Sequence, residues 1–275
     1  MKILIKILTL KITLFTYLTS LVFAGDAQSM KNQNVKNGHV VTKDQKKIYF
    51  DHYKNNHPKV IILAHGYFNS KKAILFKDMA KDLNDQYDVI IMDFRGHGES
   101  DGPFVWTAKE YQDLEAILEY AKKEYKDIGV IGFSLGAATS IIVAAQTDLI
   151  TSLIVVSPPT DFDKIEKHFW KMKISEALYN VIGEGRIGKG VRMGNLWLKK
   201  TRPIDVVQDI KIPTLFIHGK KDWLILPWHS EKLYEKIQGN KKLIMVEKGT
   251  HSEYIYRSDK EGTINMFKDW FNETL

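Results

Sequence analysis

The sequence predicts an α/β domain with a mostly parallel, eight-stranded type of sheet that helices cover on both faces. Short continuous runs of Val, Ile and Leu alternate with amphipathic stretches along the chain, which is typical of strands buried on both sides and of the helices between them. The chain has 275 residues, 44% of them hydrophobic and 27% charged, and these values suit one soluble domain with a large core. The sequence contains no internal repeat, so we expect a single domain over residues 39–275.

The strands and helices can be placed in order along the chain. The first two strands flank the polar turn Lys43-Asp44-Gln45, which predicts a hairpin, and the later ones are short apolar runs. The strands expected cover residues 39–42, 46–52, 60–64, 89–92, 129–132, 153–156, 214–217 and 243–246. Between and after them lie amphipathic or small-residue helical patterns. The helices expected cover residues 72–83, 108–125, 137–145, 228–237 and 258–271.

The first 24 residues have the pattern of a secretory signal peptide. Three lysines precede an apolar run over residues 12–24 that ends in Val22-Phe23-Ala24, so cleavage is expected after Ala24. The alternative is an uncleaved membrane anchor, but a run of 13 residues is short for crossing about 30 Å of hydrocarbon. We therefore expect an exported protein, periplasmic or secreted, with a polar linker over residues 25–38.

Composition excludes several classes of function. The net charge of the chain is +7, but residues 25–275 carry only +4, because 37 basic side chains face 33 acidic ones once the three leader lysines are removed. So small an excess of positive charge, spread along the chain, argues against nucleic acid as a partner. The sequence has no cysteine, which excludes disulfides, a thiol nucleophile and a lipid-modified cysteine after the leader.

Residues Gly132-Phe133-Ser134-Leu135-Gly136 lie at the corner between a predicted strand and a predicted helix. A G-x-S-x-G corner forces the serine into a strained conformation, and the flanking glycines let the strand and helix approach closely. The hydroxyl is then exposed at the sheet edge, beside N–H groups of a helix start that favour negative charge. The pattern therefore indicates an acyl-transfer nucleophile, with an ordinary serine N-cap as the alternative.

Other reactive side chains follow the ends of predicted strands, where ligands bind in open parallel sheets. His65, Asp222 and His251 each come at or shortly after such an end. All three are therefore expected at the sheet edge that carries Ser134, and the order along the chain is Ser, Asp, His.

With these residues in view, the chain resembles serine hydrolases of the α/β-hydrolase superfamily, in particular the esterase, monoacylglycerol-lipase-like and serine-aminopeptidase-like branch. The resemblance rests on the serine corner and on four further segments. These are His65-Gly66, Asp93-Phe94-Arg95-Gly96-His97-Gly98-Glu99-Ser100, Ile212-Pro213-Thr214-Leu215-Phe216-Ile217-His218-Gly219 followed by Asp222, and Gly249-Thr250-His251. The resemblance implies the α/β-hydrolase fold with a helical cap insertion.

The resemblance also implies a role for each site residue. Ser134 is expected to attack an acyl carbonyl, His251 to accept its proton, and Asp222 to orient the imidazole and stabilise its charged form. The backbone N–H groups of Leu135 and Tyr67 are expected to form the oxyanion hole. No cofactor is implied, and no group of histidines and carboxylates has the spacing of a metal site, so no metal is expected.

Several residues offer competing assignments. Asp161 follows another predicted strand and is the alternative triad acid. His65 and His97 precede glycines in tight turns and are expected to bond loop backbone rather than act as bases. His218 is expected to be a packed, neutral histidine, and Asp93 to organise the turn that follows it.

Residues 160–205 separate two predicted strands by more than a crossover helix needs. Apolar side chains recur there at helical spacing from Phe162 to Met172, with lysines on another side. This predicts a helical cap over the nucleophile or, alternatively, a rigid decoration packed on the core; a third interpretation is transient contact with a membrane surface. Residues 183–188 spell G-x-G-x-x-G but follow a helical stretch instead of a strand, so nucleotide binding is not expected.

The expected activity is cleavage of a small or medium carboxylic ester through an acyl-enzyme. Peptidase or thioesterase action by the same triad is one alternative. The other is a non-catalytic member of the fold that binds a ligand in the same cleft, and such a protein has no need of an aligned serine, base and acid.

Overall fold

The structure, a computed structural model, describes residues 34–162, 191–195 and 197–275. The chain divides into two units, Met1–Val35 and Lys36–Leu275, and the described helices and all strand residues except Val35 belong to the second. The predicted signal peptide, residues 25–33 of the predicted linker and residues 163–190 of the predicted cap lie outside the described residues. The G-x-G-x-x-G segment at 183–188 lies outside them too.

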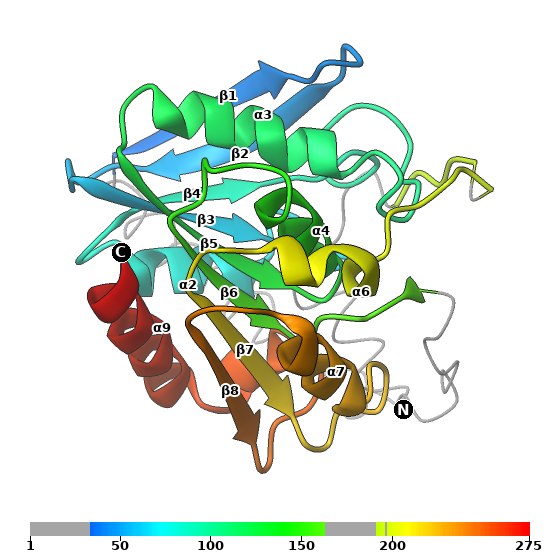
Figure 1. The fold of residues 1–275 in the computed structure, drawn as a ribbon. Coiled ribbons are helices and arrows are strands. Elements are labelled where there is room, and N and C mark those ends of the chain that lie inside the picture. Colours follow the sequence, from blue (N-terminus) through cyan, green and yellow to red (C-terminus); the bar gives the residue numbers. More distant parts are fainter. Residues whose placement is uncertain (1–33, 163–190, 196) are drawn as a thin grey trace, which may run out of the picture. The chain divides into compact units, whose positions relative to one another are not determined.

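An eight-stranded sheet with the order β1-β2-β4-β3-β5-β6-β7-β8 forms the centre of this unit (Figure 1). Strand β2 runs antiparallel to β4, whereas β4, β3, β5, β6, β7 and β8 pair in parallel. The strands are β1 (Val35–Val41), β2 (Lys47–Tyr53), β3 (Lys59–Ala64), β4 (Asp88–Met92), β5 (Asp127–Phe133), β6 (Ser152–Val156), β7 (Thr214–Gly219) and β8 (Lys241–Val246). The predicted mostly parallel sheet is confirmed.

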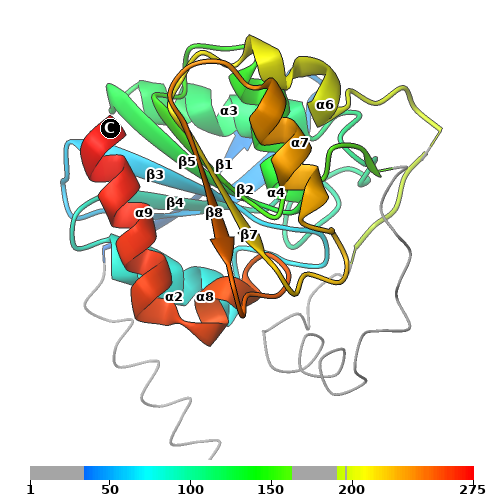
Figure 2. The same ribbon diagram turned by 60° about the horizontal axis from the view of Figure 1, so that its bottom comes forward.

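Helices cover both faces of the sheet (Figure 1 and Figure 2). One face carries α2 (Ile74–Leu83), α8 (Tyr254–Ser258) and α9 (Lys260–Thr274). The other carries α3 (Tyr111–Lys122), α4 (Leu135–Ala144), α6 (Pro203–Val206) and α7 (Trp228–Lys236). None of the helices in the described ranges is long and apolar enough to cross a membrane.

Burial on two faces explains the composition of the central strands. Every residue of β4, β6 and β7 is buried, and so is every residue but the first of β3 and β5. Continuous apolar runs therefore replace the alternation seen in half-exposed strands. The edge strands β1 and β8 contain exposed and partly buried residues instead, because each has a neighbouring strand on one side only.

Each predicted strand and helix has a counterpart among the described residues, with several boundaries displaced by two to four residues. Strand β1 begins at Val35, inside the predicted linker 25–38. The predicted helix 258–271 corresponds to α9 but starts two residues too early, because Asp259, with a non-helical φ of −151°, caps α9 by accepting a hydrogen bond from the N–H of Gly262. Helices α6 and α8 and the 3₁₀ turn Val207–Asp209 were not predicted.

Candidate active site

Ser134 stands between β5 and α4 with a φ of 51° and a ψ of −107°, a strained conformation for a residue other than glycine. Two glycines make this corner possible. A Cβ atom on Gly136 would lie 2.0 Å from the carbonyl oxygen of Ala64, and one on Gly132 would lie 2.6 Å from the carbonyl oxygen of Gly136. The predicted close approach of strand and helix is therefore present at this corner.

The structure brings Ser134, His251 and Asp222 together from three strand ends. The Nδ1 atom of His251 lies 2.8 Å from Oδ2 of Asp222, and its Nε2 atom lies 3.1 Å from Oγ of Ser134. A carboxylate only accepts hydrogen bonds, so Nδ1 carries the proton of the neutral ring and Nε2 is free to accept from the serine hydroxyl. The three side chains form one continuous hydrogen-bonded chain, and all three residues are buried.

Backbone and side-chain donors hold the Asp222 carboxylate in place. Its Oδ1 atom accepts hydrogen bonds from the N–H groups of Leu224 at 3.0 Å and Ile225 at 2.9 Å. The Nε2 atom of His218 lies 3.3 Å from Oδ2 and 2.8 Å from the carbonyl oxygen of Ile225, so this nitrogen carries a proton. His218 is buried, as expected from the sequence, but its contact with Asp222 was not predicted.

Neighbouring charges shift the pKa values of His251 and Asp222 in opposite directions. Burial alone would lower the pKa of His251. The Asp222 carboxylate and, to a smaller extent, Glu253 raise this pKa by more than burial lowers it, so it lies above the ordinary histidine value. Burial alone would raise the pKa of Asp222. His251 and His218 stabilise the carboxylate anion instead and hold this pKa well below its usual range. The site therefore favours an ionised acid beside a basic imidazole.

The backbone around Tyr67 and Leu135 lies against the serine. Leu135 is the first residue of α4, so its N–H has no acceptor within the helix. A Cβ atom on Gly66 would lie 3.4 Å from Cβ of Ser134, which puts the predicted oxyanion loop in contact with the nucleophile. This loop closes with a hydrogen bond of 3.3 Å from the N–H of Asn69 to the carbonyl oxygen of Gly66.

His65, His97 and Asp93 bond loop backbone, as expected from the sequence. Nδ1 of His65 lies 2.7 Å from the carbonyl oxygen of Gly66, and its Nε2 accepts from the N–H of Phe94 at 3.1 Å. Nδ1 of His97 lies 3.1 Å from the carbonyl oxygen of Arg95. The Asp93 carboxylate accepts hydrogen bonds from two loop N–H groups, at 2.6 and 2.9 Å.

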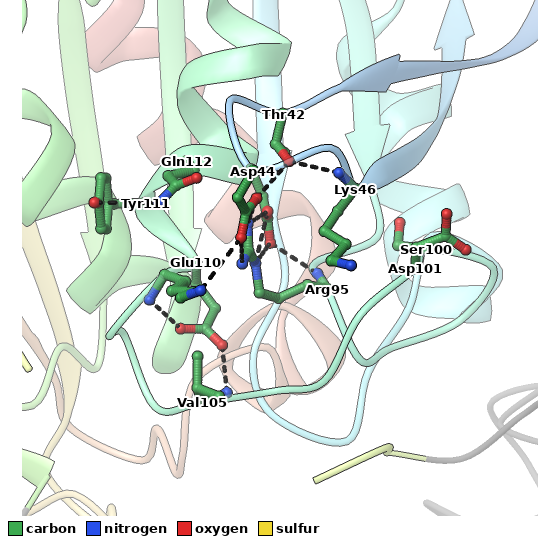
Figure 3. Close-up of polar contacts among 12 residues, drawn as sticks. Thr42, Asp44, Lys46, Arg95, Ser100, Asp101, Val105, Glu110, Tyr111 and Gln112 are labelled. Atoms are coloured by element: carbon green, nitrogen blue, oxygen red, sulfur yellow. Dashed lines mark hydrogen bonds and ion pairs between the residues drawn. The ribbon is translucent and has the colours of Figure 1, made fainter. Parts of the chain in front are cut away.

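A buried arginine fixes the loop after β4 to its neighbours (Figure 3). Arg95 donates to Asp113 of α3, with Nη2 2.7 Å from Oδ1, and to Asp44 of the β1–β2 turn, with Nη1 2.8 Å from Oδ2. Nearby, the Glu110 carboxylate accepts a hydrogen bond of 2.6 Å from the N–H of Val105. Three segments that are distant in sequence are thereby joined beside the site, a network that the sequence did not reveal.

The alternative acid, Asp161, forms an ion pair of 3.4 Å with Arg202, whereas Asp222 contacts His251. Asp161 also borders a cavity of about 650 Å³ whose wall includes Trp106, Phe162 and Trp197. This cavity is connected to the oxyanion loop by ring contacts, because Trp106 stacks on Tyr67 with ring centroids 5.1 Å apart. Its wall includes described parts of the predicted cap.

The described residues hold no group of three or more His, Cys, Asp or Glu side chains that could bind a metal ion.

Two family models match the chain. A model described as the alpha/beta hydrolase fold matches residues 59–176, and one for X-Pro dipeptidyl-peptidase (S15 family) matches residues 191–253. Among curated proteins, the uncharacterized protein YqkD of Bacillus subtilis is 27% identical over 230 residues, or 79% of this chain and 73% of YqkD. Serine hydrolase BPHL of Mus musculus is 23% identical over 73% of this chain and 75% of its own length.

Solved esterase structures share the fold. The esterase Pf2001 of Pyrococcus furiosus superposes with a TM-score of 0.72 and 25% identity over 88% of this chain and 91% of its own. An esterase from Thermogutta terrifontis superposes with a TM-score of 0.69 and 16% identity over 86% and 98% of the two chains. With the sheet order, the serine corner and the family-model match over residues 59–176 in agreement, this chain has the α/β-hydrolase fold and is similar to serine hydrolases of that superfamily.

Proposed function

We propose that this protein is a serine hydrolase that cleaves a carboxylic ester through an acyl-enzyme, with Ser134 as nucleophile, His251 as base and Asp222 as acid. The observation that carries the proposal is the hydrogen-bonded chain from Asp222 through His251 to Ser134, with steps of 2.8 and 3.1 Å. A protein that only binds a ligand has no use for this alignment. The order of the three hydrogen-bonded side chains, from acid to base to hydroxyl, is that of nucleophilic catalysis.

The first half of the reaction forms the acyl-enzyme. Oγ of Ser134 attacks the ester carbonyl carbon while Nε2 of His251 takes the hydroxyl proton. The carbonyl oxygen becomes an oxyanion, which the N–H groups of Leu135 and Tyr67 stabilise. As the carbonyl re-forms, the bond to the alcohol oxygen breaks and His251 returns its proton to the departing alcohol.

The second half releases the acid. A water molecule gives a proton to Nε2 of His251 and attacks the acyl carbon. The resulting tetrahedral intermediate collapses, its bond to Oγ breaks, and the proton on His251 restores the Ser134 hydroxyl. Asp222 stays ionised throughout and stabilises the imidazolium that forms in each half.

Similarity to named enzymes supports an ester as substrate. Pf2001 and the Thermogutta terrifontis protein are both called esterases, and BPHL is called a serine hydrolase. The cavity that Trp106 and Phe162 help to line also has polar and charged side chains in its wall, so it offers apolar surface for part of an acyl or alcohol group.

One observation favours a second candidate, peptidase action. The segment that matches the X-Pro dipeptidyl-peptidase family, residues 191–253, contains both Asp222 and His251. The two candidates share the same triad and differ in the leaving group, which is an alcohol in one and an amine in the other.

The assay that tests the proposal compares wild type with Ser134→Ala on p-nitrophenyl esters of graded chain length and on aminoacyl p-nitroanilides. We expect ester turnover by wild type and a fall in kcat of at least about 10⁴-fold in the variant. Equal turnover by both proteins would exclude Ser134 as the nucleophile. Rapid cleavage of the anilides with no ester turnover would favour the peptidase.

Export is the remaining part of the proposal. Its support is the basic and apolar leader that ends in Val22-Phe23-Ala24. The N-terminal sequence of the protein recovered from its producing cells tests it. We expect the mature chain to begin at Gly25, and a chain that retains Met1 in the membrane fraction would contradict cleavage.

A further inference from the structure

A short hydrogen bond joins the oxyanion loop to the loop that carries His251. Nδ2 of Asn69 donates to Oε1 of Glu253 over 2.6 Å, although the residues are 184 positions apart in sequence. Asn69 is 3% exposed and Glu253 is 5% exposed. A buried, charge-assisted bond of this length is among the stronger polar contacts in proteins.

Asn69 is the last residue of a strained turn. The turn runs from Gly66 through Tyr67 and Phe68, and it closes with the 3.3 Å bond from the N–H of Asn69 to the carbonyl oxygen of Gly66. Phe68 has a φ of 62°, a strained conformation for a bulky residue other than glycine. Its side chain is 56% exposed, so burial of the ring does little to compensate. The turn therefore needs an external contact to keep its shape.

Glu253 provides that contact from the other side of the site. It follows His251 by two residues and precedes α8, and the N–H of Tyr254 bonds the carbonyl oxygen of His251 at 3.1 Å. A Cβ atom on Gly66 would lie 3.8 Å from Oε2 of Glu253 as well as 3.4 Å from Cβ of Ser134. The nucleophile and this carboxylate therefore both lie close to the position that a side chain on Gly66 would occupy.

We propose that Asn69 and Glu253 are positioning residues, which together hold the Tyr67 N–H at a fixed place relative to Ser134 and His251. This inference rests on the proposed function, since it assigns a role within the same triad and oxyanion hole. Without the bond, the strained turn relaxes and the Tyr67 N–H moves away from the oxyanion. The oxyanion exists only in the tetrahedral state, so the loss falls on kcat and leaves KM nearly unchanged.

The charge of Glu253 can be separated from its bond. Among the described residues, the charged and titratable groups that face His251 are Asp222, on the loop after β7, and Glu253, on its own loop, with His218 behind Asp222. In Glu253→Gln the side-chain carbonyl still accepts from Asn69, but the negative charge is gone. The pKa of His251 then falls, because Glu253 contributes to raising it.

A double-mutant cycle tests the bond. We expect Asn69→Ala and Glu253→Ala each to lower kcat by about 10- to 100-fold with KM within about threefold of wild type. The double variant is expected to lose little more than the worse single variant, because both substitutions break one contact. Glu253→Gln is expected to keep most of kcat and to move the acid limb of kcat/KM to lower pH.

Asn84→Ala is the matched control. Asn84 is 4% exposed and donates through the same atom to the carbonyl oxygens of Tyr53 at 3.2 Å and Tyr87 at 2.9 Å, away from the triad. We expect this variant to lower the melting temperature and to leave kcat unchanged. A merely structural role of Asn69 would give the same result.

The inference is overturned if folded Asn69→Ala turns over ester as wild type does, or if the losses in the cycle multiply. Two results with Glu253→Gln also count against the inference: an acid limb of kcat/KM at the same pH as in wild type, or a loss of kcat as large as that of Glu253→Ala. Because this variant is isosteric, it provides the test if the alanine variants do not fold. Wild type that is inactive towards esters and anilides and is not labelled by a fluorophosphonate overturns the proposed function itself. Active wild type with an unaffected Asn69→Ala overturns only this inference.

Discussion

Gly136 packs against the main chain of Ala64 so closely that a Cβ atom on it would lie 2.0 Å from the Ala64 carbonyl oxygen. Helix α4 therefore begins directly over β3, and Ser134 at its start is held beside the loop that follows β3. The nucleophile and the oxyanion loop owe their proximity to the absence of a side chain at position 136.

Gly136→Ala is expected to lower the free energy of unfolding by about 3 kcal/mol or more, because the clash involves backbone atoms of two central elements. Chemical denaturation measures the effect. Gly239→Ala is the control, since a Cβ atom there meets nothing closer than 3.9 Å, and only the cost of its positive φ, about 1 kcal/mol, is expected. Equal losses in both variants would argue against the close packing.

Asp222→Asn should lower kcat by about 10³- to 10⁴-fold, because an amide neither fixes the ring tautomer nor stabilises the imidazolium. Asp161→Asn is the matched variant and should stay within about threefold of wild type, since Asp161 is paired with Arg202. Steady-state kinetics on one p-nitrophenyl ester decide between them. A larger loss of kcat in Asp161→Asn than in Asp222→Asn would make Asp161, which follows β6, the triad acid.

The pH dependence of kcat/KM should follow His251. The ring must be neutral to accept a proton, so activity is lost as the pH falls through its pKa, which Asp222 and Glu253 hold above the ordinary value. The acid limb is therefore expected to have its midpoint above about pH 6.5. Two esters with different leaving groups should give the same midpoint, and a midpoint well below pH 6 would contradict the assignment.

Arg95→Met should destabilise the fold by about 3–5 kcal/mol, because it leaves the buried Asp113 carboxylate without its partner. Lys220→Met provides the comparison. Its ion pair with Glu247 is about half exposed or more on both sides, and such pairs contribute at most about 1 kcal/mol. Thermal and urea unfolding measure both variants, and similar small losses would show that the Arg95 network is dispensable.

Much of the fold was predictable because its signals are local. The buried strands are continuous apolar runs, and the corner at Ser134 is encoded by glycines two positions away on each side. The start of α9 also had a local signal, since Asp259 caps the N–H three residues later, and the predicted helix began one residue before this cap. The short helix α8 was missed because one turn is too short to show a helical period.

The site was predictable as a set of strand ends but not as a set of contacts. Asp161 and Asp222 both follow parallel strands, and only the side-chain geometry shows that Asp222 meets His251. The contacts of Asn69 with Glu253 and of His218 with Asp222 depend on the packing of loops from different strands. Single residues of these types carry no pattern that a sequence could reveal.

The most direct measurement is to locate the covalent adduct that a fluorophosphonate leaves on the folded wild-type protein, by mass spectrometry of its proteolytic peptides. The account predicts one adduct, on the peptide that contains Ser134, and slower labelling in His251→Ala. An adduct on another residue, or labelling that proceeds equally fast without the His251 imidazole, would contradict the account.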